Sequence, residues 1–403
     1  MTDIAETSIG LARAESRPPT VLQVLPRLVS GGVERGTVEI VQALVAAGWR
    51  ALVASAGGPM AHEIERAGGR HVTLPLHSKN PLVMYANIGR LAGLIRRAQV
   101  DIVHARSRAP AWSALFAARR AGAHFVTTFH NAYGGRSMAK RLYNSVMAKG
   151  ERVIAISEFV GGHVTATYGV HDNRLRVIPR GVDFLRFSPE NVGAERLISL
   201  SRQWHLPDGA PIVMLPGRLT RWKGQEVLTD ALALLRRPDI RCVLVGSGDG
   251  RYGRQLQARA LSLGVSAQLQ MVDECRDMAA AYMLADVVVS ASTSPEGFGR
   301  VIVEAQAMGR PVIATDHGGA RETVLPGSTG WLVPPGDPRA LAHAIEAALA
   351  LTPEERAAQA ARAIEHVRRE FDTATMGGRT LEVYEEVLFP AAAAIKAARS
   401  VLA

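Results

Sequence analysis

The stretch that decides the fold is EGFGRVIVE, from Glu296 to Glu304. The apolar run before it, DVVVS at 286–290, predicts a buried strand. After it, VIVEAQAMG predicts a helix that stops at Gly309, and PVIAT at 311–315 predicts the next strand. A strand, a glycine-rich loop, a helix and a further strand predict an open parallel sheet, which binds ligands at the carboxyl ends of its strands.

The loop inside this stretch offers groups that bind anions and sugars. Gly297, Phe298 and Gly299 present backbone N–H groups near a helix N-terminus, where unpaired donors and the helix dipole favour anionic oxygens. Helical side chains lean toward the N-terminus, so Glu296 and Glu304 can reach one small region. A carboxylate accepts two hydrogen bonds and a sugar diol donates two, which suits a phosphorylated sugar. Two unrelated solvated glutamates are an equally open alternative.

A second loop, PGRLTRWKG at 216–224, also lies between a predicted strand and a predicted helix. Arg218 and Lys223 are then two cations beside a helix N-terminus, a placement that suits a diphosphate. The loop is not a P-loop, because Trp222 stands where the second glycine should be. Two ordinary surface cations would give the same pattern.

Two further glycine clusters carry weaker signals. Gly31 and Gly32 follow the first predicted strand and open a helix, so they form either a close-approach loop or a simple turn. The segment VGSGDG at 245–250 lacks the third glycine of a dinucleotide fingerprint, since Arg251 takes its place. The sequence therefore disfavours NAD binding.

His104 and His130 each end a predicted strand in the first half of the chain. Either histidine could shuttle a proton or donate a hydrogen bond at a ligand, and either could instead be a structural histidine. There is no HExxH or other close pairing of histidines in the sequence, so no metal site is predicted.

The alternation of strand and helix patterns continues along most of the 403 residues, which predicts an α/β protein with two Rossmann-like, doubly wound parallel sheets. Residues 186–209 show no clear strand and are interpreted as the interdomain link. We expect a flexible leader at 1–19, an N-terminal domain at 20–190, a C-terminal domain at 191–375 and a helical tail at 376–403 that packs back toward the N-terminal domain.

Charge and cysteine content narrow the class of protein. Residues 1–186 hold 24 Lys/Arg against 12 Asp/Glu, a net charge of +12, whereas the remainder has a net charge of −2. A basic half suits acidic substrates, anionic lipid or nucleic acid, but no RNA- or DNA-binding motif is present and aromatic residues are only 5%. The sequence has no secretory signal and no apolar run long enough to span a bilayer. With only Cys242 and Cys275, a reducing cytoplasm is expected.

A basic segment, 137–152, combines Lys140 and Arg141 with apolar residues such as Leu142. Such a helix either rests on an anionic membrane surface or packs its apolar stripe against a domain core. Both interpretations are open from the sequence.

Taken together, the motifs resemble those of the retaining glycosyltransferase family 4, which has the two-domain GT-B fold. The ordered signatures are SGGVE (30–34), TFH (128–130), GRLTRWKG (217–224) and EGFGRVIVE (296–304), and they cover nearly the whole chain. The resemblance implies two Rossmann-like domains facing across a cleft, with the acceptor at the N-terminal domain and a nucleotide-sugar donor at the C-terminal domain.

The resemblance also implies roles for individual residues. Gly31 and Gly32 would approach the donor phosphates, while Arg218 and Lys223 would neutralise the diphosphate leaving group. Glu304 would hold the ribose diol, and Glu296 with the backbone of Phe298 and Gly299 would hold the transferred hexose. His130 would lie beside the donor sugar and the acceptor hydroxyl. Transfer would proceed on the front face of the sugar, without a metal, other cofactor or covalent intermediate.

The expected donor is GDP-mannose, with a UDP-glucose donor as the second choice. The segment HARSRAPAW (104–112) and the basic first half look most like transferases that build lipopolysaccharide core or other envelope glycolipids. The acceptor would be a membrane-anchored glycolipid met at the cytosolic face of the inner membrane. Arg180 stands where the family often has Asn, a departure that would affect interdomain or donor contacts. Asp273 lies where the family usually has a glycine-containing loop under the base, so the choice between guanine and uracil stays open. The sequence does not indicate the oligomeric state.

Two other functions are compatible with the same motifs. A nucleotide-sugar epimerase of this fold would need no acceptor. A binding protein without catalysis would be expected to have lost the costly charges of Glu296, Glu304, Arg218 and Lys223, all of which are present.

Overall fold

The computed structural model describes residues 17–29, 31–134 and 137–391. Ser30, most of the predicted leader and the end of the predicted tail lie outside the described residues. The chain forms two compact units. The first unit comprises Met1–Ile154, Val164–Arg176 and Gly377–Ala403, and the second comprises Ala155–His163 and Val177–Met376. Residues 177–190, which the sequence placed with the N-terminal domain, therefore lie in the second unit.

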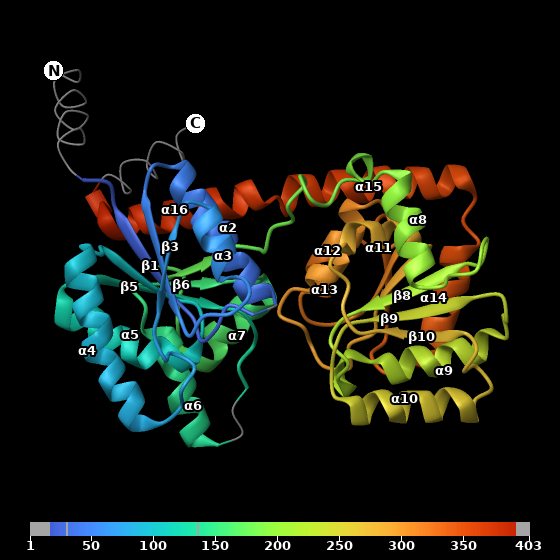
Figure 1. Cartoon of the computed structure of the whole chain (residues 1–403), viewed down its shortest axis with the longest axis horizontal. Helices are drawn as coiled ribbons and strands as arrows, with labels where there is room; N and C mark the ends of the chain where they lie inside the picture. Colours follow the sequence, from blue (N-terminus) through green and yellow to red (C-terminus); the bar gives the residue numbers. More distant parts are fainter. Residues whose placement is uncertain (1–16, 30, 135–136, 392–403) are drawn as a thin grey trace, which may run out of the picture. The chain divides into compact units, whose positions relative to one another are not determined.

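The first unit is built on a seven-stranded sheet with the order β3-β2-β1-β4-β5-β6-β7 (Figure 1). The neighbouring pairs from β3 to β5 are parallel. Every residue of β1 and β4 is buried, as expected for central strands that are covered on both faces. The strands are β1 (Thr20–Val24), β2 (Arg50–Ser55), β3 (Arg70–Thr73), β4 (Ile102–Ala105), β5 (His124–Phe129), β6 (Arg152–Ala155) and β7 (Leu175–Val177).

Helices cover both faces of the first sheet, with α2 and α16 on one side and α4 and α5 on the other (Figure 1). They are α2 (Gly32–Ala46), α3 (Ala61–Arg66), α4 (Pro81–Ala98), α5 (Arg108–Ala121), α6 (Met138–Asn144), and parts of α7 (Glu158–Tyr168) and of the C-terminal α16 (Thr373–Leu388). Residues 158–163 of α7 and 373–376 of α16 belong to the second unit. Helices α2 and α5 thereby bury an apolar face against strands that are apolar on both sides.

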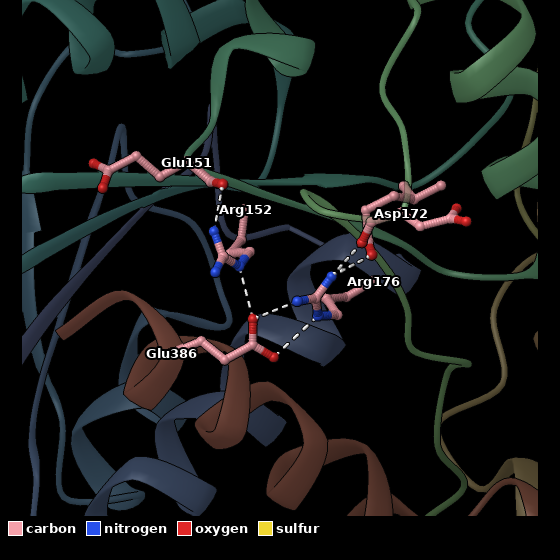
Figure 2. A network of polar contacts seen from close by, with 6 residues as sticks. Glu151, Arg152, Asp172, Arg176 and Glu386 are labelled. Carbon is pink, nitrogen blue, oxygen red and sulfur yellow. Dashed lines mark hydrogen bonds and ion pairs between the residues drawn. The ribbon is translucent and has the colours of Figure 1, made fainter. Parts of the chain in front are cut away.

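The C-terminal part of α16 is attached to the first unit by an ionic clamp. Glu386 accepts hydrogen bonds from Nε of Arg152 on β6 at 2.7 Å and from both Nε and Nη2 of Arg176 on β7, at 3.0 and 2.7 Å (Figure 2). Tyr384, which is fully buried on the same helix, shares a hydrogen bond with Nδ1 of His104 at 2.6 Å. Residues 377–388 of the predicted tail are thus an integral helical part of this unit.

The second unit has a six-stranded sheet with the order β10-β9-β8-β11-β12-β13, and all five neighbouring pairs are parallel. The strands are β8 (Ile212–Pro216), β9 (Arg241–Val245), β10 (Leu269–Val272), β11 (Val287–Ser290), β12 (Val312–Thr315) and β13 (Gly330–Val333). The continuous burial of β8 and β11 explains why their sequences are apolar without alternation.

Helices α9 and α10 lie on one side of the second sheet, and α11 and α12 lie on the other (Figure 1). The helices of this unit are α8 (Ala194–Gln203), α9 (Gln225–Leu235), α10 (Gly250–Ser262), α11 (Met278–Leu284), α12 (Arg300–Ala307), α13 (Ala320–Thr323), α14 (Pro338–Leu349) and α15 (Pro353–Glu370). Side chains such as Leu215, Leu244 and Val289 pack with α9, α10 and α14 into one buried cluster.

The expected α/β class with two doubly wound parallel sheets is confirmed. Some elements differ from the sequence expectation. Helix α8 lies within the segment that was interpreted as a linker, and the short strand β7 and the short helix α13 were not expected. Among the described residues, no helix has both the length and the apolar character needed to cross a membrane.

Candidate active site

The second sheet reverses its strand order between β8 and β11. The chain runs from β8 outward through β9 to β10, then returns to the other side of β8 to form β11. The loops that follow β8 and β11 consequently begin at adjacent carboxyl ends, and ligands of open α/β sheets bind at such a reversal. These are the two loops, 216–224 and 291–299, that carry the predicted site residues.

Glycines allow the backbones of these loops to touch. Gly224 has φ +75°, and a Cβ added there would lie 1.8 Å from the carbonyl oxygen of Ala291. The backbone N–H of Thr293 donates to the carbonyl oxygen of Trp222 at 2.7 Å. The loop after β12 also contacts the loop after β11, since the N–H of Gly319 donates a hydrogen bond to the carbonyl oxygen of Glu296 at 3.0 Å. Only a residue without a Cβ fits position 224.

An ion pair links the two predicted loops. Nζ of Lys223 donates to Oε1 of Glu296 at 2.8 Å, and the two side chains are only 13% and 17% exposed. The hydroxyls of Ser290 and Ser292 donate to the same oxygen. In the part of the chain that the structure describes, Oε2 of Glu296 accepts no hydrogen bond, so it can receive a ligand hydroxyl.

The surroundings of Glu296 keep its carboxyl group ionised. Burial raises its pKa, but the Lys223 ammonium and the hydrogen bonds from Lys223, Ser292 and Ser290 outweigh burial, so the net pKa lies below its ordinary value. An ionised acceptor suits the hydroxyl groups of a sugar.

Glu304 is also held by donors. Its Oε2 accepts from the hydroxyl of Tyr282 at 2.9 Å, and its Oε1 accepts from Nε of Arg300 at 3.2 Å. The carboxylate is 13% exposed. Sequence reasoning predicted Glu304 but missed its two partners. Tyr282 lies on a different helix, α11, and meets Glu304 only through folding. Arg300 lies four residues before Glu304 on α12, and that spacing could have identified it.

The N-terminus of α12 lies between the two glutamates in the sequence. Gly299 precedes it with φ +86°, a left-handed conformation that favours glycine, and no side chain caps the helix. Phe298 is buried and its ring packs edge-on against Phe371 at 5.4 Å, which anchors the loop. The first N–H groups of α12 can therefore bind an anion.

Arg218 differs from Lys223 in its surroundings. Its side chain is exposed, and its guanidinium makes no hydrogen bond or ion pair with any residue that the structure describes. Its carbonyl oxygen accepts from Nε2 of Gln225 at 2.9 Å, which fixes the backbone of the loop. The side chain is thus available to an anionic ligand.

The remaining predicted residues lie in the first unit. Gly31 has φ +152° and precedes α2, which starts at Gly32 immediately after the loop of β1. The first sheet reverses its order between β1 and β4, so this helix N-terminus lies at a second such reversal. His130 follows β5, and its backbone N–H donates to the hydroxyl of Tyr133 at 3.4 Å. Contact of these residues with a ligand stays a prediction.

His104 has a structural environment. It is fully buried, and its two ring nitrogens share hydrogen bonds with Tyr384 and with Thr128 at 2.7 Å. Burial, together with the nearby charge of Arg106, lowers its pKa well below the ordinary value. A neutral histidine with both nitrogens engaged has no free group for a ligand.

Comparison with known proteins now assigns the family. The profile described as Glycosyltransferase Family 4 matches residues 30–186, and the one described as Glycosyl transferases group 1 matches residues 199–366. A GDP-mannose-dependent monoacylated alpha-(1-6)-phosphatidylinositol monomannoside mannosyltransferase of Corynebacterium glutamicum is 31% identical over 309 residues, which cover 73% of this chain and 79% of that enzyme. The chain belongs to glycosyltransferase family 4.

Other members of glycosyltransferase family 4 match parts or all of the chain. A D-inositol 3-phosphate glycosyltransferase of Xylanimonas cellulosilytica is 33% identical over 246 residues, or 60% of this chain and 58% of that enzyme. The chain thus spans little more than half the length of this curated relative. A crystal structure of a glycosyltransferase from Rickettsia africae has 37% sequence identity and a TM-score of 0.85, covering 93% of this chain and 100% of that one. The two parallel-sheet units have the GT-B fold of the family.

The two departures from the family pattern have different surroundings. Arg180 is 4% exposed and therefore buried within the second unit. Asp273 is exposed directly after β10.

Proposed function

We propose that this glycosyltransferase family 4 protein is a retaining hexosyltransferase that moves a hexose from a nucleoside diphosphate sugar to a glycolipid. The observation that carries the proposal is the Lys223–Glu296 pair at the strand reversal of the second sheet. One side chain suits a diphosphate and the other suits sugar hydroxyls, and a nucleotide sugar has both groups side by side.

The charged residues have different roles in the proposed reaction. As the glycosidic bond opens, negative charge develops on the leaving diphosphate, and Lys223, Arg218 and the N-terminus of α12 stabilise it. Nζ of Lys223 has three N–H donors and gives one to Glu296, so donors remain for phosphate oxygens. Glu296 holds the hexose. A phosphate oxygen of the donor takes the acceptor proton, so transfer proceeds on the front face without a metal.

The proposed donor is GDP-mannose, with a UDP-glucose donor second. The name of the Corynebacterium glutamicum relative, which is GDP-mannose-dependent, supports this order. Thermal unfolding with GDP, UDP and ADP tests it, since a ligand that binds only the folded state raises Tm. We expect the largest rise with GDP, and a rise with none of them would overturn the proposed function.

A transfer assay then tests the reaction. Enzyme, GDP-mannose and acceptor should yield an α-linked mannoside whose anomeric configuration matches that of the donor, and chelation with EDTA should leave the rate unchanged. Donor without acceptor should remain unconverted. Formation of an epimer from donor alone would instead establish an epimerase, and donor binding without any turnover would establish a binding protein.

The proposed acceptor is a membrane-anchored, phosphorylated glycolipid. Lipopolysaccharide core is the class predicted from the sequence, and the relative named above acts on a phosphatidylinositol mannoside. Both carry negative charge, which the net charge of +12 in residues 1–186 attracts. Parallel assays with lipopolysaccharide core and with phosphatidylinositol mannosides distinguish the two sources.

The first unit exposes a surface suited to an anionic membrane, as proposed for segment 137–152. Met138 and Leu142 on α6 are 88% and 65% exposed, and Leu82 and Tyr85 on α4 are 79% and 77% exposed. The two helices lie close together, because neighbouring residues of α5 contact both of them. Exposed Lys140 lies on α6 among these side chains.

The second part of the basic segment behaves differently. Val146 and Met147 are fully buried, so they pack against the core of the unit as the alternative interpretation required. The proposed membrane surface therefore consists of Leu82, Tyr85, Met138, Lys140 and Leu142 only. Exposed apolar side chains of this size beside a cation are typical of helices that insert shallowly among lipid headgroups.

Co-sedimentation with vesicles of phosphatidylcholine and phosphatidylglycerol tests this surface. The wild type should bind, and binding should fall with added salt. Leu142→Ser should weaken binding by about tenfold, since a buried leucine side chain contributes ~1.5 kcal/mol or more. Leu261→Ser, at a leucine 71% exposed on α10, is the matched control and should bind as the wild type does. Equal binding by Leu142→Ser and the wild type would remove the membrane surface from the proposal.

A further inference from the structure

The carboxylate of Glu304 is fixed from two sides by residues that the motif did not identify. The hydroxyl of Tyr282 donates to Oε2 at 2.9 Å, and Nε of Arg300 donates to Oε1 at 3.2 Å. Each carboxylate oxygen has two lone pairs, so one on each oxygen stays available to a ligand. The pair of donors therefore determines which way the two available lone pairs point.

Tyr282 is held rigidly in this position. It is fully buried on α11, and its ring packs edge-on against Phe187 with 6.0 Å between ring centroids. Burial raises its pKa well above the ordinary value, and the neighbouring carboxylate of Glu304 raises it further. The phenol thus keeps its proton and acts as a donor to Glu304.

Arg300 completes the arrangement from the first turn of α12. It lies four residues before Glu304, a spacing at which helical side chains meet, and its side chain is 16% exposed. Its cation also stands beside the helix N-terminus, where the diphosphate is proposed to bind. Because both partners of Glu304 come from helices with fixed packing, the carboxylate is oriented before any ligand arrives.

We propose that Tyr282 and Arg300 are positioning residues that orient Glu304 to accept the 2′- and 3′-hydroxyls of the donor's ribose. The inference rests on the proposed function, which places the ribose at Glu304. Two adjacent hydroxyls meet two carboxylate oxygens whose directions are already set, so little rotational freedom is lost on binding. The benefit exists only for a ligand that carries both hydroxyls.

The test compares two ligands that differ only in the ribose. Dissociation constants for GDP and for 2′,3′-dideoxy-GDP are measured by calorimetry with the wild type, Tyr282→Phe and Arg300→Met; UDP and its dideoxy form replace them if UDP gives the larger thermal shift. Each variant should bind the ribonucleotide about tenfold more weakly or worse, the size typical of a lost hydrogen bond to a charged group. In Tyr282→Phe, binding of the dideoxynucleotide should change by less than about twofold. In Arg300→Met, which also removes a cation beside the proposed diphosphate site, the ribonucleotide should lose more affinity than the dideoxynucleotide. With the nucleotide sugar, Tyr282→Phe should raise KM while kcat changes little.

Tyr384→Phe is the matched control, because it removes a buried tyrosine hydroxyl in the first unit that hydrogen-bonds to His104. It should leave the ratio of the two dissociation constants as in the wild type. Equal weakening of both nucleotides in Tyr282→Phe would show a structural role and overturn the inference, as would no weakening of either. Equal binding of GDP and 2′,3′-dideoxy-GDP by the wild type would overturn the inference while leaving the nucleotide-binding proposal intact. A wild type that binds no nucleotide would overturn both.

Discussion

Two cations in one loop, Arg218 and Lys223, have different surroundings. Their substitution should lower turnover in both cases but should affect stability differently. Arg218 is exposed and its guanidinium has no partner among the described residues, whereas Lys223 is paired with Glu296 at 2.8 Å. Loss of either should lower turnover at least tenfold, since about 1.4 kcal/mol of leaving-group stabilisation has that effect.

Arg218→Ala and Lys223→Met should have different effects on the free energy of unfolding. Arg218→Ala should change the free energy of unfolding by no more than about 0.5 kcal/mol, as for other exposed residues. Lys223→Met should cost about 3 kcal/mol, because it leaves a buried carboxylate without its cation. Urea unfolding together with kcat for both variants checks this. Near-wild-type turnover in both would show that the diphosphate binds elsewhere.

Glu296 gives a prediction about pH. Its folded-state pKa is depressed by Lys223 and the serine hydroxyls despite burial, so its ionised form stabilises the fold above the ordinary carboxyl pKa of 4.5 and this stability is lost as the pH falls through the folded-state value. The difference in free energy of unfolding between the wild type and Glu296→Gln should be constant near neutral pH and shrink below about pH 4.5. A difference that persists undiminished in acid would contradict the ion pair.

At the scale of the element, the contact between loops depends on Gly224. Its φ of +75° is nearly matched by the +72° of Gly209, yet a Cβ at 209 meets nothing within 4 Å while one at 224 would collide with the carbonyl oxygen of Ala291. Gly209→Ala should cost about 1–2 kcal/mol through backbone conformation alone.

Gly224→Ala should cost about 2 kcal/mol more than the matched substitution, because the β8 and β11 loops must also separate. It should also weaken nucleotide binding, which Gly209→Ala should not. Thermal unfolding with and without GDP measures both effects. Equal stability of the two variants would show that the loops do not depend on this approach.

These elements also show how much of the fold and of the candidate site can be predicted from the sequence. The apolar runs DVVVS (286–290) and PIVML (211–215) predicted central strands because both faces of such strands are buried, and the glycines predicted loops at the strand ends. The two loops meet because the strand order reverses between β8 and β11. A doubly wound pattern predicts that such a reversal exists, but the sequence does not show between which strands it lies. Sequence pattern could therefore identify Lys223 and Glu296 separately.

Their pairing was not predictable. Lys223 and Glu296 are 73 residues apart, and Tyr282 and Glu304 are 22 apart, so each contact exists only through the packing of whole elements. Ser292 looked like any loop serine, although its hydroxyl donates to Glu296. The division of the chain after Arg176 was missed for the same reason, since it depends on contacts with residues far along the chain.

In the whole molecule, the chain passes from the second unit back to the first within α16. Glu386 holds the C-terminal part of this helix against the first unit (Figure 2). The carboxylate is 24% exposed and bridges Arg152 and Arg176. Glu386→Ala should lower the free energy of unfolding by about 1–3 kcal/mol, between the values for exposed and buried ion pairs. Urea unfolding and hydrogen exchange in 377–388 measure the effect.

Arg379→Ala on the same helix is the control. Arg379 is exposed, so its loss should change stability by no more than about 0.5 kcal/mol. If Glu386→Ala is as stable as this control and exchanges no faster, the clamp contributes nothing to holding the helix.

A crystal structure of the protein with GDP-mannose bound is the most direct test of the proposed donor site. The diphosphate should lie at the N-terminus of α12 within hydrogen-bond distance of Lys223, with the hexose on Glu296 and the ribose hydroxyls on Glu304. Density for the nucleotide sugar at another place, with Glu296 and Glu304 keeping only their present protein partners, would contradict it.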